Sequence, residues 1–138
     1  MNIYALHFDG SCPKNPGEKA SYGFTIHESI ELIKKDHGAV LLDGILDNHI
    51  AEFFALYRGL QAVESSLLPG SWIEVRGDDR TVMNILSKRW KAMPEKRYYP
   101  AYLKVSNYLK KLRKLGYTFQ FYWIPRTMNT ECDLLSRQ

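Results

Sequence analysis

Two short apolar runs, each leading into an aspartate and separated by a helical segment, constrain the fold of this chain most. Residues 3–9 end in Asp9, and residues 72–77 are followed by Asp78. Between them, residues 49–65 carry apolar side chains at helical spacing, which predicts an amphipathic helix. A helix that connects two strands favours parallel pairing of those strands. Because the carboxyl ends of parallel strands meet at one edge of a sheet, we expect Asp9 and Asp78 to lie close together.

The rest of the chain predicts an α/β fold with a mixed five-stranded sheet flanked by helices. Residues 20–27 and 30–42 read as two strands of a hairpin that turns near Glu28-Ser29, and residues 117–124 as a last strand. Three further helices are predicted at 79–88, 101–115 and 130–137. The first three strands would be antiparallel and the later ones parallel. Asn48 is the expected N-cap of the first long helix, because its amide oxygen suits that position.

Length and composition indicate one domain, residues 1–138. A chain of this size buries roughly two-thirds of its unfolded surface, which is enough for a self-sufficient core. Its two cysteines provide no disulfide framework. No apolar run approaches the ~18 residues of a membrane span, and the first residues show no signal-peptide pattern. We therefore expect a cytoplasmic monomer with free thiols, without an obligatory protein partner and without membrane attachment.

Charge is distributed unevenly along the chain. Residues 88–114 contain ten Lys and Arg and one acidic residue, a local charge of +9, whereas the remainder carries −5. In the first part of this segment, basic residues alternate with Trp90 and two tyrosines outside a helical pattern. Such a segment favours contact with a polyanion through phosphates and stacking, although a solvated helix face at 101–115 and aromatic residues that belong to the core are the simpler alternatives.

Two more acids complete a set of four in separate local motifs. Glu52 lies inside the helix at 49–65, and Asp133 lies at the start of the last helix. Each acid has a plain structural explanation: Asp9 in a turn, Glu52 on a solvated helix face, Asp78 at a helix cap, and Asp133 closing a capping box with Thr130. If the four converge, their repulsion requires a cation. Two Mg²⁺ ions, which Mn²⁺ could replace, would hold a phosphodiester there.

The four motifs in this order resemble type 1 ribonuclease H over essentially the whole chain. The first is Asp9-Gly10-Ser11-Cys12-Pro13-Lys14-Asn15-Pro16-Gly17, and the last runs from Trp123-Ile124-Pro125-Arg126 to Cys132-Asp133. The last stretch is similar to the shorter form of the family, which lacks a mobile loop histidine. The resemblance implies a ribonuclease H-like fold and an endonuclease that hydrolyses the RNA strand of RNA–DNA hybrids.

The resemblance also implies roles for the acids. Asp9 would bridge two Mg²⁺ ions, Asp133 would help to hold the ion that activates water, and Glu52 and Asp78 would hold the ion beside the leaving 3′-oxygen. The products would carry 5′-phosphate and 3′-hydroxyl ends. Asp79, next to the ligand Asp78, would be the N-cap of the following helix.

Substrate contacts are implied in the same way. Asn15 and Asn48 match positions near the 2′-hydroxyls of the hybrid, and Trp90 matches the aromatic residue of a DNA-strand channel. Lys88 and Arg89 are added from the basic segment, and Arg126 could contact phosphate where other members carry the loop histidine. The candidate substrate-binding residues are thus Gly10, Ser11, Asn15, Asn48, Lys88, Arg89, Trp90 and Arg126. The chain departs from the family pattern at Asp47, where a threonine is frequent, and at His49, where an amide is usual.

A different class of function stays open at this point. A ribonuclease H-like domain can bind nucleic acid without cutting it, or it can serve a reverse transcriptase or transposase. The four acids favour cleavage, because a module that only binds has no use for a metal site.

Overall fold

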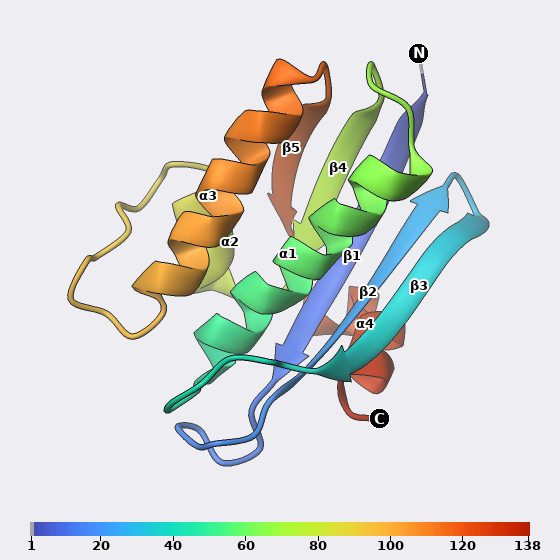
Figure 1. The fold of residues 1–138 in the computed structure, drawn as a ribbon. Coiled ribbons are helices and arrows are strands. Elements are labelled where there is room, and N and C mark those ends of the chain that lie inside the picture. The colour runs from blue at the N-terminus through green and yellow to red at the C-terminus, as the bar shows by residue number, and fades with distance from the viewer. Residues whose placement is uncertain (1) are drawn as a thin grey trace.

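Strand β1 (Ile3–Ser11) lies at the centre of a five-stranded mixed sheet (Figure 1). The computed structural model describes residues 2–138. The remaining strands are β2 (Ser21–Glu28), β3 (Glu31–Ala39), β4 (Trp72–Gly77) and β5 (Thr118–Trp123), in the order β3-β2-β1-β4-β5. The β3-β2-β1 pairs are antiparallel, and β1, β4 and β5 run parallel. This confirms the predicted fold class.

The helices cover the two faces of the sheet unequally. One face carries α1 (Asn48–Ser66), the short α2 (Arg80–Leu86) and α3 (Tyr99–Lys114), with α3 packed on α1. The other face carries only α4 (Thr130–Ser136), which packs against β2 and β1 and follows the 3₁₀ turn η1 (Arg126–Met128). No helix within residues 2–138 has an apolar stretch long enough to cross a membrane.

The core lies between the sheet and α1. Leu6 and Phe8 of β1 are fully buried, as are Phe53, Leu56 and Leu60 of α1. Burying side chains of this size is the main stabilising contribution, at about 1.5–3 kcal/mol each. The apolar side chains at helical spacing in α1 extend beyond the core itself, because Phe54 and Tyr57 are only partly buried and pack at the margin of the core.

Several element ends differ from the sequence prediction. The N-cap of α1 is Asp47, whose side chain accepts a hydrogen bond from the Ile50 N–H, and not Asn48. The alternative explanation of Asp133, a capping box with Thr130, does not hold, because Asn129 is the N-cap of α4 and its side chain makes no capping hydrogen bond. Asp79 caps α2 as expected, accepting from the Val82 N–H at 3.0 Å.

Strand and helix lengths also differ in places. β3 ends at Ala39 and not at residue 42, and α2 ends at Leu86 and not at 88. α3 begins at Tyr99 with Pro100 in its first turn. A helix tolerates proline there because the backbone N–H groups of the first turn have no acceptor within the helix, so the N–H that proline lacks breaks no hydrogen bond. Both cysteines are free and buried, as expected.

Gly10 allows β1 and α1 to approach closely. A β carbon at this position would lie 2.2 Å from the carbonyl carbon of Ala51 and 2.5 Å from the Glu52 nitrogen, both rigid backbone atoms. The absence of a side chain at Gly10 therefore brings the end of β1 against the turn of α1 that carries Glu52.

We expect Gly10→Ala to lower the free energy of unfolding by about 1–3 kcal/mol or more, because the strand must move away from the helix. Urea denaturation measures this loss. Ser11→Ala, one residue further along the strand, is the matched control and should change stability by less than ~0.5 kcal/mol. Equal stability of Gly10→Ala and the wild type would contradict the close approach.

Candidate active site

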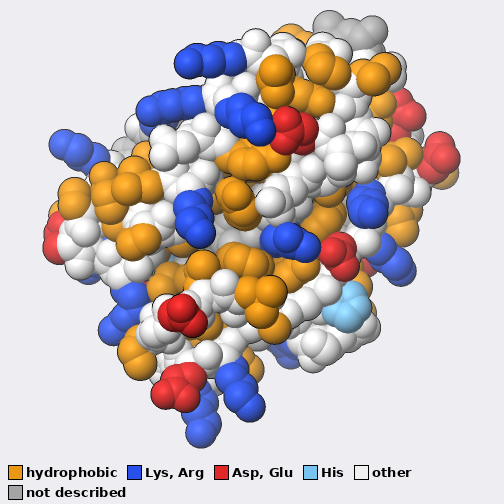
Figure 2. Space-filling model, in the orientation of Figure 1, with side chains coloured by type: hydrophobic (Ala, Val, Ile, Leu, Met, Phe, Trp, Pro, Cys, Tyr) orange, Lys and Arg blue, Asp and Glu red, His pale blue; other side chains and the backbone are white. Residues whose placement is uncertain are grey.

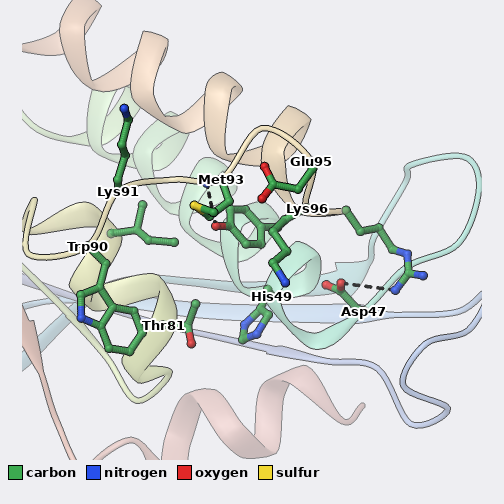
Figure 3. Close-up of a pocket in the computed structure, with 11 residues that line it drawn as sticks. Asp47, His49, Thr81, Trp90, Lys91, Met93, Glu95 and Lys96 are labelled. Carbon is green, nitrogen blue, oxygen red and sulfur yellow. Dashed lines mark hydrogen bonds and ion pairs between the residues drawn. The ribbon is translucent and has the colours of Figure 1, made fainter.

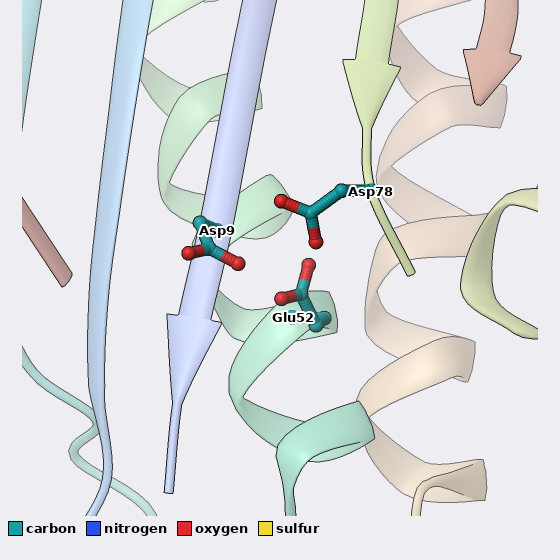
Figure 4. A group of neighbouring side chains, drawn as sticks. All are labelled: Asp9, Glu52 and Asp78. Carbon is teal, nitrogen blue, oxygen red and sulfur yellow. The ribbon is translucent and has the colours of Figure 1, made fainter. Parts of the chain in front are cut away.

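Three acidic side chains point toward one another where β1 and β4 end (Figure 4). Asp9 comes from β1, Asp78 directly follows β4, and Glu52 comes from the first half of α1. One carboxylate oxygen of each lies within 4.8 Å of the others. The parallel pairing of β1 with β4 and the contact at Gly10 together produce this cluster.

Burial makes two of these carboxylates unusual. Asp9 is 5% and Glu52 3% exposed, so Glu52 is not a solvated surface residue. Glu52 Oε1 accepts a hydrogen bond from the Gly10 N–H at 3.0 Å, whereas its buried Oε2 has no partner among residues 2–138. Burial, with smaller contributions from neighbouring acids, raises the pKa of Asp9 to about 6, and burial next to Asp9 raises the pKa of Glu52 well above its ordinary value.

Asn129 positions Asp78. Its amide Nδ2 donates to the Phe8 carbonyl at 2.9 Å and to Asp78 Oδ2 at 3.0 Å, and its side chain is buried. Burial raises the pKa of Asp78, and the Asn129 hydrogen bond partly opposes this. Sequence reasoning assigned no role to Asn129, although it stands inside the closing motif.

Asp133 lies at the edge of the same cleft but outside the group within 4.8 Å. Its Oδ1 is 3.0 Å from Arg126 Nη2 and 3.3 Å from Arg137 Nε. Burial alone would raise the pKa of Asp133, but the hydrogen bond and charge of Arg126 lower it overall. Among the four acids Asp9, Glu52, Asp78 and Asp133, Asp133 is therefore the most readily ionised.

The cleft measures about 200 Å³ and brings together most residues expected near the cut site. It is lined by Asp9, Gly10, Ser11, Asn48, Glu52, Asp78, Asp79, Arg126 and Asp133. Asn15 lies beside it, since the Asn48 N–H donates to Asn15 Oδ1 at 3.1 Å. Asn48 Oδ1 accepts from the Cys12 N–H, so both exposed asparagines keep their NH₂ groups for an acceptor.

The acid cluster fits a divalent cation. Carboxylate oxygens are the ligands that Mg²⁺ and Mn²⁺ prefer. Burial raises the pKa of all three acids, and Glu52 Oε2 has no hydrogen-bond partner among residues 2–138, so the ionised forms of these acids gain from a nearby positive charge. A cation would provide that interaction.

A larger hollow of about 830 Å³ opens beside the cleft, between the N-terminal end of α1, α2 and the segment that precedes α3 (Figure 3). Trp90 is at one end of it and Asp47 at the other, with His49 and Lys96 between them. Figure 2 shows Lys and Arg side chains spread over this helical face of the molecule. Trp90 is 52% exposed, so it is not a core residue.

The predicted basic contacts divide between different places. Lys91 lines the hollow with Trp90, whereas Lys88 lines a small depression between α2 and α3. Arg89 is exposed. Lys96 and Arg97 also line the hollow. Like Lys91, they belong to the basic segment that favours contact with a polyanion, but they were not among the eight candidate substrate-binding residues.

The two departures from the family pattern have structural partners. Asp47 caps α1, and its Oδ2 lies 3.7 Å from Arg97 Nη1, so its charge is partly compensated. His49 Nδ1 lies 2.8 Å from Asp79 Oδ2, a hydrogen bond that raises the pKa of His49. Asp79 therefore interacts with the α2 backbone and His49, while its neighbour Asp78 joins the acid cluster.

A model of the reverse transcriptase-like family matches residues 7–138. The chain belongs to this family. It is 29% identical over 136 residues to the bifunctional protein Rv2228c of Mycobacterium tuberculosis and to an uncharacterized protein of Mycobacterium bovis, Mb2253c, covering 95% of the chain. The chain spans about a third (34%) of the length of these curated relatives.

Solved structures confirm the predicted resemblance to type 1 ribonuclease H. The N-terminal RNase H domain of rv2228c from Mycobacterium tuberculosis superposes with a TM-score of 0.80 at 25% identity, over 99% of this chain and 92% of that one. RNase H1 of Halobacterium salinarum gives 0.78 at 23% identity, over 98% and 95%. LC11-RNase H1 in complex with an RNA/DNA hybrid gives 0.83 at 22% identity, over 97% and 94%. The chain is thus a ribonuclease H-like domain whose acid cluster indicates a nuclease.

Proposed function

We propose that residues 1–138 form a single ribonuclease H domain that cuts the RNA strand of RNA–DNA hybrids in a metal-dependent reaction, leaving 5′-phosphate and 3′-hydroxyl ends. The observation that carries this proposal is the group of three converging carboxylates, with one unpartnered oxygen, beside a basic hollow. Monomeric action in the cytoplasm, without an obligatory protein partner, belongs to the same proposal.

The acids of the cleft would hold the metal. Asp9, Glu52 and Asp78 supply oxygen ligands from three directions, and Asp133 adds a fourth carboxylate at the rim. Two Mg²⁺ ions, or Mn²⁺ in their place, supply Lewis acidity and lower the pKa of bound water when they are present. Asn129 holds Asp78 in its orientation, and Gly10 holds Glu52 through its N–H.

The rim and the hollow would bind the two strands differently. Asn15 and Asn48 are joined by the hydrogen bond from the Asn48 N–H to Asn15 Oδ1, and their free NH₂ groups suit a 2′-hydroxyl, which distinguishes RNA from DNA. Gly10 and Ser11 leave room at the same rim, where Arg126 can meet a phosphate. In the hollow, Trp90 offers an aromatic face and nearby lysines offer positive charge to the DNA strand.

A four-substrate assay tests the proposed function. RNA–DNA hybrid, duplex DNA, duplex RNA and single-stranded RNA, each labelled, are incubated with Mg²⁺ and with excess EDTA. We expect cleavage of the RNA strand of the hybrid only when the metal is present. Tight hybrid binding without cleavage would support the alternative, a module that binds nucleic acid without cutting.

Salt dependence tests the role of the hollow. We expect Lys91→Ala with Lys96→Ala to weaken hybrid binding and to reduce the slope of log K against log salt by about 1.8, because each lost phosphate contact contributes about 0.9. Fluorescence anisotropy across a salt series measures this slope. Lys104→Ala with Lys114→Ala on α3 removes the same charge elsewhere and should leave the slope nearly unchanged. An equal effect of both pairs would mean that only overall charge matters.

A further inference from the structure

A second cavity lies on the sheet face that α4 covers, opposite to α1 and α3. It measures about 220 Å³ and lies between β1, β2, η1 and α4. His7 of β1 faces this side because its neighbours Leu6 and Phe8 are in the core beneath α1, and side chains alternate along a strand. His7 pairs across the strands with Thr25, and His27 lies two residues further along β2 on the same face.

The lining is rich in groups that bind transition metals. Besides the two imidazoles it contains the Glu131 carboxylate, the Cys132 thiol and the Asn129 amide. The Cys132 Sγ lies 3.6 Å from Thr25 Oγ1, which places the buried thiol next to the cross-strand partner of His7. Nitrogen, oxygen and sulfur donors around one cavity contrast with the acid cluster, which offers carboxylate oxygens alone.

Unpartnered polar atoms are concentrated in the same place. Within residues 2–138, three buried side-chain polar atoms have no hydrogen-bond partner. One is Glu52 Oε2 in the acid cluster, and the other two, His7 Nδ1 and Asn129 Oδ1, belong to residues that line this cavity. Because buried polar atoms without partners are costly, an ion or molecule that interacts with them would be stabilised in this cavity.

One pair of donors, on His27 and Glu131, has nearly the spacing of a metal site, whereas His7 lies further away. His27 Nε2 lies 3.7 Å from Glu131 Oε1, too far for a hydrogen bond, whereas two ligands of one tetrahedral Zn²⁺ at about 2.1 Å lie roughly 3.4 Å apart. The ring centres of His7 and His27 are 6.2 Å apart, against roughly 5 Å for two imidazoles on one such ion. The acid cluster is the one trio in the described chain with donor atoms already within 4.8 Å. An ion here would therefore draw the rings together by about 1 Å.

We propose that this cavity binds one transition-metal ion of the Zn²⁺ class through His7, His27 and Glu131. Imidazole ligands favour such ions over Mg²⁺, which prefers the oxygen-only acid cluster. The three ligands come from β1, β2 and α4, so the ion joins α4 to the sheet. Its effect reaches the active site, because Asn129 and Asp133 flank Glu131 and belong to the acid site described above.

Metal titration in excess Mg²⁺ tests this site, since the excess Mg²⁺ competes with Zn²⁺ for the acid cluster. Isothermal titration with Zn²⁺ and the visible spectrum of added Co²⁺ report binding without any reference to cleavage. We expect one ion per chain for the wild type and at least a tenfold weaker affinity for His27→Gln and for Glu131→Gln. Both side chains are partly exposed, so the variants should fold. His37→Gln on edge strand β3 is the matched control and should bind as the wild type does.

Two results would overturn the site. Absence of Zn²⁺ binding in excess Mg²⁺ would mean that the cavity holds water, which also satisfies buried polar groups. Binding that survives in His27→Gln and Glu131→Gln but is lost in Glu52→Gln would place the ion in the acid cluster instead. Thermal unfolding with and without Zn²⁺ verifies that each variant is folded.

Discussion

Asp78→Asn is expected to reduce hybrid cleavage by about 100-fold or more, whereas Asp79→Asn, one residue further, should leave it largely intact. The two substitutions are chemically identical, but Asp78 faces Asp9 and Glu52, while Asp79 caps α2 and contacts His49. Removing one charge from a group that stabilises the transition state commonly costs this much. Asparagine is nearly as good an N-cap as aspartate and can still accept from His49. Single-turnover cleavage of labelled hybrid measures both variants.

Thermal unfolding serves as the control for this pair, because both variants should remain folded at the assay temperature. If Asp79→Asn is inactive and Asp78→Asn is active, the assignment of the two aspartates is reversed. If both cut at the wild-type rate, the acid cluster is not the catalytic site. Asp79→Ser is a poorer control, because serine keeps the cap but is too short to replace the contact with His49.

Asp9→Asn is expected to stabilise the metal-free protein at pH 7.5, by on the order of 2–3 kcal/mol in the free energy of unfolding. Asp9 ionises near its ordinary value of 3.8 when unfolded, but its pKa in the folded protein is raised to about 6. Between pH 3.8 and about 6, Asp9 is ionised in the unfolded chain but still protonated in the folded protein. The free energy of unfolding therefore falls as the pH rises through this range, and above about pH 6 the full cost of burying the ionised Asp9 is present. Asparagine carries no such penalty.

The quantity to measure is the difference in the free energy of unfolding between the wild type and Asp9→Asn. Burial, with the nearby Arg76 charge, lowers the pKa of His7 to about 4. The contribution of His7 to stability is therefore lost as the pH falls below 6.5, and in the wild type this pH dependence is opposite in sign to that of Asp9. Urea denaturation of both proteins in EDTA from pH 4 to 7.5 should show a gap that widens with pH. Mg²⁺ should then raise the melting temperature of the wild type more than that of Asp9→Asn. Asp43→Asn, at an exposed position, controls for net charge, and a gap that does not change with pH would contradict the prediction.

The strand and helix patterns were sufficient to predict the mixed sheet and the convergence of Asp9 with Asp78, whereas the place of Glu52 beside them was implied only by the resemblance to type 1 ribonuclease H. Apolar runs that lead to Asp9 and Asp78, joined through a helix, have few alternatives to parallel pairing at one sheet edge. The same pattern could not distinguish Asp47 from Asn48 as the N-cap of α1, since both residue types cap well. Only the folded structure shows that Asn48 Oδ1 accepts a hydrogen bond from the Cys12 N–H and so does not cap α1.

Other features of the site could not be predicted, because they depend on the directions of side chains, which local sequence patterns do not determine. Lys88 has a left-handed backbone, with φ of 66°, directly after α2, and such a conformation is uncommon for lysine. It contributes to turning Lys88 away from the hollow that Lys91 and Trp90 line. The His49–Asp79 hydrogen bond and the role of Asn129 join residues 30 and 51 positions apart, which sequence spacing alone cannot predict.

The two hydrogen bonds of Asn129 have a consequence for synthesis of the chain. They connect Asn129 to Phe8 and Asp78, which precede it in the chain and are synthesised earlier. The sheet edge that carries Asp9 and Asp78 can form before α4 docks, but Asp78 is then without its amide partner and Asp133 is not yet in place. The acid site is therefore complete only after α4 has docked on the sheet, and under the proposed function a partly folded chain would not cut nucleic acid.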